Sequence, residues 1–242
     1  MLHNEKPSPL ASIDVLILCG GLGSRLRPLI ADRPKGLALI GGRPFLDILV
    51  EDLIQHQFRR LIFCVGHLKE QIIEQYQHRQ DAEYLFSQED TPLGTGGAVQ
   101  RALPLVHSDT CLVINGDSRC AVAFEAFWQF HCRKAAVASF VLTAPAGRQD
   151  GGLICINETQ QIQSFAEKAS VTPQRGFINA GIYLLQREWL VLPHVQAPFS
   201  LEHDVFPNLI STQPCFGFVV PSPLIDIGTP ERYRQANEEY RI

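Results

Sequence analysis

The chain has 242 residues, of which 45% are hydrophobic and 19% charged, and its formal net charge is −4. This composition is typical of a folded globular protein and excludes disordered and collagen-like chains. The acidic balance argues against a nucleic-acid partner, because the displacement of counterions from a nucleic acid requires a basic surface. The length allows one large domain or two small ones, and one domain is the expectation for an α/β chain.

The N-terminal segment 1–12 is polar and has no apolar core of signal-peptide length, so we expect a flexible tail and a cytoplasmic protein. No apolar run approaches the roughly 20 residues that a membrane span needs, which predicts no membrane partner. The seven cysteines include no C-x-x-C pair, and several stand inside apolar runs. They are predicted to be buried thiols in a reducing compartment. The histidines lack the H-E-x-x-H spacing of a zinc site.

Short apolar runs alternate with amphipathic segments along the first half of the chain. Strands are predicted at 15–19, 60–65, 82–87, 111–115 and 136–142. Helices are predicted at 44–58, 68–76, 95–103 and 124–132. This order indicates an α/β fold with a mostly parallel sheet and helices on both faces.

The second half of the chain has a different pattern. Two short strands at 153–157 and 161–165 predict a hairpin, and a further strand is expected at 180–185. A helix is expected at 200–209, where the Ser200 hydroxyl caps the first amides and two acidic residues favour the positive end of the helix dipole. Thr229-Pro-Glu231 opens the last predicted helix. We expect one domain over 13–242.

A glycine-rich loop follows the first predicted strand directly. Gly20, Gly21 and Gly23 let consecutive backbone amides approach an anion, at the sheet edge where open α/β folds bind ligands. Arg25 and Lys35 add two cations suited to a triphosphate. A dinucleotide fingerprint would need glycine where Leu26 stands, and no G-K-[ST] sequence follows the loop. A nicotinamide oxidoreductase and a P-loop NTPase are therefore disfavoured.

The loop, Leu18-Cys-Gly-Gly-Leu-Gly-Ser-Arg-Leu-Arg27, together with Arg33-Pro-Lys35, resembles the signature of the sugar-1-phosphate nucleotidyltransferases. Further stretches match in order along almost the whole chain: Pro92-Leu-Gly-Thr-Gly-Gly-Ala98, Val113-Ile-Asn-Gly-Asp117, Phe165-Ala-Glu-Lys168, Asn179-Ala-Gly-Ile-Tyr183 and Ile225-Asp-Ile-Gly-Thr-Pro-Glu231. Within this family, the Leu-Gly-Thr-Gly-Gly and Phe199-Ser-Leu-Glu202 stretches and the Asp-Ile-Gly near the end most resemble the D-glycero-D-manno-heptose 1-phosphate guanylyltransferases.

The resemblance implies a Rossmann-like fold of the nucleotide-diphospho-sugar transferases with a small antiparallel sugar-binding part. The nucleotide-binding half would cover about 13–120 and the sugar-phosphate-binding half about 121–242. The implied reaction joins a nucleoside monophosphate from an NTP, with GTP favoured, to a sugar 1-phosphate, with the heptose favoured. It releases pyrophosphate and yields an NDP-sugar for surface polysaccharide biosynthesis. Because a phosphate monoester is largely dianionic at neutral pH, positioning and charge neutralisation are the catalytic task.

The resemblance also implies roles for individual residues. Catalysis is expected from Arg25, Lys35 and Asp117. The nucleotide is expected to lie against Gly20, Gly21, Gly23, Ser24, Arg25, Lys35, Gln88, Glu89, Gly94 and Thr95. The sugar phosphate is expected to lie against Gly116, Gly152, Glu167, Lys168 and Asn179. Asp117 and Asp226 would hold Mg²⁺, a hard cation that prefers oxygen ligands. Glu89 is the candidate acceptor for guanine N–H groups.

Several alternatives stay open at this point. Two other substrate pairs are alternatives to GTP with the heptose. One is GTP with mannose 1-phosphate, and the other is UTP or dTTP with a hexose 1-phosphate. A non-catalytic nucleotide-sugar sensor on the same fold is disfavoured, because Arg25, Lys35, Asp117 and Asp226 are all present. A homo-oligomer is compatible with the sequence, which does not determine the oligomeric state.

Overall fold

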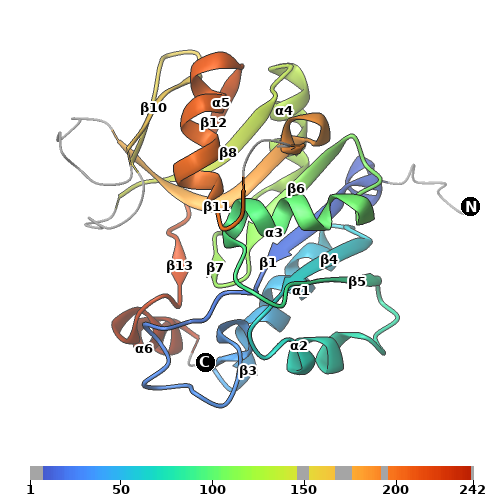
Figure 1. Ribbon diagram of the computed structural model, residues 1–242. Coiled ribbons are helices and arrows are strands. Elements are labelled where there is room, and N and C mark those ends of the chain that lie inside the picture. Colours follow the sequence, from blue (N-terminus) through green and yellow to red (C-terminus); the bar gives the residue numbers. More distant parts are fainter. Residues whose placement is uncertain (1–7, 146–152, 167–175, 192–195, 241–242) are drawn as a thin grey trace, which may run out of the picture.

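Strand β1 (Asp14–Leu18) lies in the middle of a nine-stranded sheet (Figure 1). The computed structural model describes residues 8–145, 153–166, 176–191 and 196–240. The first four residues of β1 are buried, because helices cover both faces of the sheet. The strand order is β10-β9-β11-β6-β1-β4-β5, and β8 joins the sheet by pairing with β11 and β12.

The other strands of the large sheet are β4 (Arg60–Val65), β5 (Glu83–Gln88), β6 (Thr110–Asn115), β8 (Ala138–Thr143), β9 (Leu153–Ile156), β10 (Ile162–Ala166), β11 (Phe177–Gln186) and β12 (Cys215–Val219). Parallel pairing joins β1 to β4 and β6, β4 to β5, and β8 to β12. Strand β11 is antiparallel to β6, β8 and β9, and β10 is antiparallel to β9. Within this sheet β10 and β11 thus run against the rest, which confirms the predicted, mostly parallel sheet and the hairpin.

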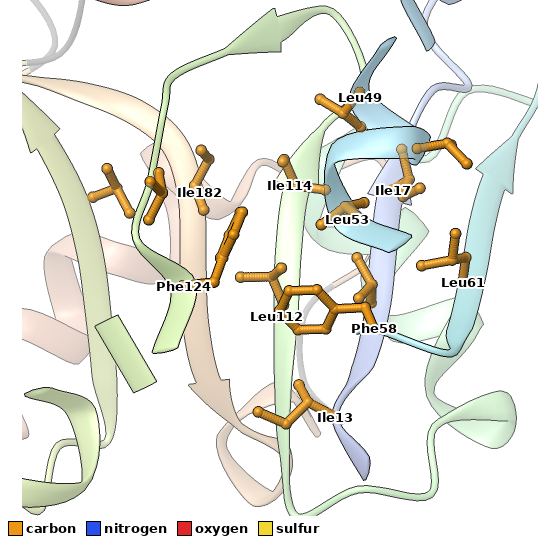
Figure 2. Close-up of a cluster of buried hydrophobic side chains, with 14 of the residues drawn as sticks. Ile13, Ile17, Leu49, Leu53, Phe58, Leu61, Leu112, Ile114, Phe124 and Ile182 are labelled. Carbon is orange, nitrogen blue, oxygen red and sulfur yellow. The ribbon is translucent and has the colours of Figure 1, made fainter. Parts of the chain in front are cut away.

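The helices divide between the two faces of the sheet. Helices α1 (Phe45–Gln55), α2 (Lys69–Tyr76) and α4 (Phe124–Arg133) pack on the face that receives Val15 and Ile17. Figure 2 shows part of this cluster, in which Leu53 lies between Leu49 and Phe58. Helices α3 (Gly94–Ala102) and α5 (Phe206–Thr212) pack on the other face, which receives Leu16. Each fully buried aliphatic or aromatic side chain stabilises the fold by about 1.5–3 kcal/mol.

A third, smaller apolar cluster, which includes Leu26, Phe45 and Ala236, packs helix α6 against the rest of the protein. Helix α6 (Pro230–Glu239) begins after Thr229, whose side chain accepts a hydrogen bond from the Arg232 amide, as a capping residue does. Two short antiparallel pairs lie outside the large sheet: β2 (Leu39–Ile40) with β3 (Arg43–Pro44), and β7 (Ser118–Arg119) with β13 (Ile225–Asp226). The β7–β13 pair joins segments far apart in the sequence at the edge of the site described below.

The structure corrects two predictions and adds one strand to the large sheet. The predicted flexible tail 1–12 is wrong for its last residues, because Pro9–Ser12 forms a 3-10 helix that buries Leu10. The predicted helix 200–209 begins as a π-helix, Leu201–Val205, and becomes α-helical at Phe206, although the predicted Ser200 cap is present. Strand β12 was not predicted.

The cysteines are all free, and Cys64, Cys111, Cys120 and Cys215 are buried as expected. Cys132 is exposed, so the expectation of burial is wrong for this thiol. No helix in the described part of the chain is long and apolar enough to cross a membrane.

Candidate active site

A cavity of about 450 Å³ opens at the carboxyl ends of β1, β4 and β6. Predicted site residues from four separate stretches line it: Gly20, Gly21, Gly23, Ser24, Arg25, Lys35, Glu89, Gly94, Thr95, Gly116 and Asp117. Parallel strands end at the same sheet edge, so loops distant in sequence converge there. The chain folds so that the glycine loop, two cations and two carboxylates share one cavity.

The glycine loop turns sharply after β1. Gly23 has a φ of +59°, a conformation that glycine adopts without steric cost, and its carbonyl accepts from the Leu26 and Arg27 amides. A Cβ atom on Gly20 would lie 2.8 Å from Glu89 Oε1, and one on Gly66 would lie 2.7 Å from the same oxygen. A Cβ atom at either position would therefore displace the Glu89 carboxylate from its place against the loop.

Glu89 follows β5 directly and is half-buried. Its Oε2 accepts from the Leu93 amide over 3.4 Å, and desolvation raises the pKa of its carboxyl group. Gln88 is exposed, and its carbonyl oxygen, rather than its side chain, accepts a hydrogen bond from Arg101. Gln88 is absent from the described residues that line the cavity, whereas Glu89 is among them.

The first turn of α3 is held by Phe199, which lies shortly before the π-helix. Gly94 has a φ of +74°, and a Cβ atom there would lie 2.3 Å from the Phe199 carbonyl oxygen. The Phe199 amide donates to the Leu93 carbonyl over 3.0 Å, and the Phe199 carbonyl accepts from Gly96 over 3.0 Å. This close backbone contact holds Thr95 at the cavity wall.

A second cavity of about 200 Å³ shares Arg25, Lys35 and Asp117 with the first. Lys35 Nζ lies 2.5 Å from Asp117 Oδ2. Arg25 is exposed. Asn179, expected against the sugar phosphate, and Asp226, expected to hold the metal, both line the second cavity.

Pairing of β7 with β13 brings the two predicted metal ligands to one place. Asp226 is in register with Ser118, and the Ile227 amide donates to the Asp117 carbonyl over 3.0 Å. Asp226 Oδ1 accepts from the Gly228 amide over 2.9 Å and from Arg232 Nη1 over 3.2 Å. Two carboxylates that line the same cavity are a donor set that suits a hard cation. Among the described residues, no group of three or more acidic, histidine or cysteine side chains forms a larger metal site.

Two residues of the second cavity were missed as functional candidates. Tyr183 lies on β11, and its hydroxyl accepts from Asn179 Nδ2 over 2.7 Å. Glu202 was interpreted as a helix-dipole partner, but its carboxylate lines the cavity and accepts from Thr95 and Tyr183. The sequence did offer a signal for both, since Tyr183 and Glu202 end two of the stretches that match the family, Asn179-Ala-Gly-Ile-Tyr183 and Phe199-Ser-Leu-Glu202. The predicted residues Gly152, Glu167 and Lys168 lie outside the described residues.

The nucleotidyl transferase family matches residues 14–241 of the chain. The D-glycero-alpha-D-manno-heptose 1-phosphate guanylyltransferase of Campylobacter jejuni is 31% identical, with 91% of this chain and 97% of that protein covered. The mannose-1-phosphate guanylyltransferase catalytic subunit beta of Drosophila melanogaster is 32% identical over 90% of this chain. The chain spans 60% of the length of that relative.

Solved structures agree with the sequence matches. The crystal structure of HddC from Yersinia pseudotuberculosis superimposes with a TM-score of 0.81 at 31% identity, covering 94% of this chain and 99% of HddC. A second structure of HddC, complexed with GMP-PN, gives a TM-score of 0.80. A putative glucose-1-phosphate thymidylyltransferase from Bacillus anthracis has the same fold, with a TM-score of 0.83 at 19% identity. From the fold, the glycine-loop cavity and these matches, the chain is a member of the nucleotidyl transferase family.

Proposed function

We propose that this protein transfers a guanylyl group from GTP to a sugar 1-phosphate, and that the sugar is D-glycero-D-manno-heptose. The observation that carries the choice of base is Glu89, a half-buried carboxylate in the wall of the first cavity. Guanine presents two neighbouring N–H donors on its pairing edge, and an ionised carboxylate can accept from both. Uracil and thymine lack that pair of donors. Gly20 and Gly66 leave the space that the carboxylate occupies.

The transfer needs two anions to meet in line. A phosphate oxygen of the sugar 1-phosphate attacks the α-phosphorus of GTP, a new P–O bond forms, and the bond to the β-phosphate oxygen breaks. The electron pair of that bond leaves with pyrophosphate. Glycine-loop amides and Arg25 hold the triphosphate, and Lys35 lies where both cavities meet. The cations stabilise charge that moves onto the leaving group, so no strong base is required.

Asp117 and Asp226 are the residues that would hold Mg²⁺ in this proposal. They lie beside each other through the β7–β13 pairing, and both line the second cavity. The ion, when bound, would neutralise phosphate charge and fix phosphate oxygens. Each aspartate also has a fixed cationic neighbour, Lys35 or Arg232, which keeps the carboxylates oriented.

The choice of heptose follows from relatives that match over their whole length. The heptose 1-phosphate guanylyltransferase of Aneurinibacillus thermoaerophilus is 29% identical, and the alignment covers 94% of this chain and 98% of that protein. Mannose 1-phosphate is the second candidate acceptor, since the mannose enzymes match at similar identity over part of their length.

The test is a matrix of pyrophosphate release with Mg²⁺, in which GTP, UTP, dTTP, CTP and ATP are each combined with heptose, mannose and glucose 1-phosphates. Turnover confined to GTP with the heptose is the expected result. Turnover with GTP and mannose 1-phosphate would correct the acceptor, and turnover confined to UTP or dTTP would overturn the assignment of Glu89. Binding of an NDP-sugar without turnover of any pair would identify a sensor.

A further inference from the structure

The carboxylate of Glu202 lies between the two cavities and accepts hydrogen bonds from both sides. Thr95, from the wall of the first cavity, donates to Glu202 Oε2 over 2.8 Å. Tyr183, from the wall of the second cavity, donates to Oε1 over 3.3 Å. The Ser200 hydroxyl donates to Oε2 over 2.8 Å. The transfer proposed above assigns no step to this carboxylate.

The direction of each hydrogen bond in this cluster is fixed by its other contacts. The Leu201 amide donates to Thr95 Oγ1 over 2.8 Å, which leaves the Thr95 hydroxyl proton for Glu202. The Gly181 amide donates to Asn179 Oδ1, so the Asn179 amide nitrogen faces Tyr183. Tyr183 then accepts from Asn179 and donates to Glu202. A continuous chain of donors therefore runs from each cavity to a single terminal acceptor.

The backbone reinforces the same connection. Phe199 forms main-chain hydrogen bonds with Leu93 and Gly96 in the first turn of α3. A Cβ atom on Gly94 or on Gly96 would lie 2.3 Å from Phe199, so both glycines permit this close contact. Ser200 Oγ accepts from the Glu202 and His203 amides, which fixes the start of the π-helix. A ligand that fixes the first turn of α3 thus also fixes the segment that carries Glu202.

We propose that Glu202 is a positioning residue that couples occupation of the nucleotide site to occupation of the sugar-phosphate site. A nucleotide against the first turn of α3 orders Thr95 and, through Glu202, orders Tyr183 and Asn179 in the second cavity. The second ligand then meets a site whose side chains are already held, so it binds more tightly. The inference rests on the proposed function in taking the two cavities as nucleotide and sugar-phosphate sites.

The experiment measures this coupling directly, without turnover. Calorimetry gives the Kd of α,β-methylene-GTP, in which the bond that breaks is replaced, with and without a saturating amount of the sugar 1-phosphate that turns over best. We expect the acceptor to tighten nucleotide binding by about fivefold or more in the wild-type protein. Linkage requires the nucleotide to tighten acceptor binding by the same factor, which is an internal check. In Glu202→Gln and in Tyr183→Phe the factor is expected to fall below about twofold.

Glu158→Gln is the matched control, because Glu158 is exposed in the turn between β9 and β10. It should keep the wild-type factor. Thermal melts of all variants separate a folding defect from a loss of coupling, and Tyr183→Phe provides a second test should Glu202→Gln be destabilised.

Three results would overturn the proposal. They are a wild-type protein without coupling, a Glu202→Gln variant with unchanged coupling, and a variant that weakens both ligands equally at a constant factor. Failure of the proposed function is a separate outcome. Should the GTP analogue not bind while the UTP or dTTP analogue does, the guanine assignment fails, and the coupling is measured with the analogue that binds.

Discussion

The side chains of Lys35 and Asp117, 82 positions apart in the sequence, form an ion pair with 2.5 Å between Nζ and Oδ2. The Lys35 side chain is 14% exposed, and both residues line both cavities. An ammonium group has three donors, so Lys35 can bind phosphate oxygens while Asp117 fixes its position. In the proposed reaction, this pair stands where the nucleotide and the acceptor phosphate meet.

Replacement of Lys35 by methionine keeps most of the aliphatic stem and removes the charge. We expect kcat for pyrophosphate release to fall by roughly 100-fold or more, the usual loss when a group that stabilises transition-state charge is removed. Lys134→Met, which changes a lysine at the end of α4, should retain wild-type kcat. Equal losses in the two variants would show that Lys35 has no special role.

Replacement of Glu89 by glutamine tests the guanine contact and the cost of burying its carboxyl group. Because desolvation raises its folded-state pKa above the unfolded value, the native state binds more protons between the two values. The ionised group therefore destabilises the fold at neutral pH. Glu89→Gln should raise Tm slightly and weaken GTP binding by about tenfold, the effect of removing one charge-assisted hydrogen bond.

The pH dependence of the wild-type protein gives an independent check on Glu89. The ionised carboxylate is the form that accepts from guanine, so GTP binding should weaken as the pH falls through the raised pKa. The affinity for GTP should begin to fall at a higher pH than it would for an ordinary glutamate. In Glu89→Gln the affinity should depend less on pH. A variant with unchanged affinity and preference for GTP would contradict the assignment.

Arg60 offers a comparison between a buried and an exposed partner at the opposite edge of the sheet. Asp14 is 1% exposed and accepts from Arg60 over 2.6 Å and from the Ser108 amide over 2.8 Å. Glu83, whose side chain is 54% exposed, accepts from Arg60 over 2.7 Å. Asp14→Ala should lower the free energy of unfolding by about 3–5 kcal/mol, because it leaves buried donors unpaired. Glu83→Ala should cost at most about 1 kcal/mol.

Chemical denaturation of both variants measures this difference. Their kcat values at a temperature where both are folded should match the wild type, since this pair lies at the amino end of β1 and the site lies at its carboxyl end. Similar losses of stability in the two variants would refute the distinction between buried and exposed partners.

His131 should make the fold sensitive to mild acid. It is 3% exposed on α4, its Nδ1 lies 2.9 Å from Ser139 Oγ, and burial lowers its pKa to about 4. Between about pH 4 and pH 6.5 the unfolded state binds more protons than the native state. The free energy of unfolding is therefore undiminished above this pH range and decreases as the pH falls through it. The loss amounts to about 3 kcal/mol at most. In His131→Asn the free energy of unfolding should vary less between pH 7 and pH 4.5.

Local patterns determined the elements of this fold. Continuous apolar runs identified β1, β4 and β6, because strands buried on both faces need apolar residues at every position. The glycine loop predicts an anion site, because an anion can approach backbone amides closely only where the residues are small. The alternation of strands and helices along the chain then predicts a parallel sheet with the site at the carboxyl ends of its strands.

Other features were decided by contacts between distant segments. Strand β12 pairs with β8 from far along the chain, and the β7–β13 pair sets Asp226 beside Ser118, which follows Asp117. No local periodicity encodes a partner that many residues separate. The same limit explains why both Gln88 and Glu89 were expected against the nucleotide, whereas of the two only Glu89 is among the described residues that line the cavity. The Glu89 carboxylate occupies the space that Gly66 leaves.

Glu202 shows this division most clearly. The sequence by itself determined that Ser200 begins a helical segment and that an acidic residue is favourable in its first turn. The tertiary structure decided that this turn is π-helical and that Thr95 and Tyr183 converge on the Glu202 carboxylate. Three segments must pack together before that acceptor has its donors, so its function follows from the packing, whereas the glycine loop and its cations follow from adjacent residues.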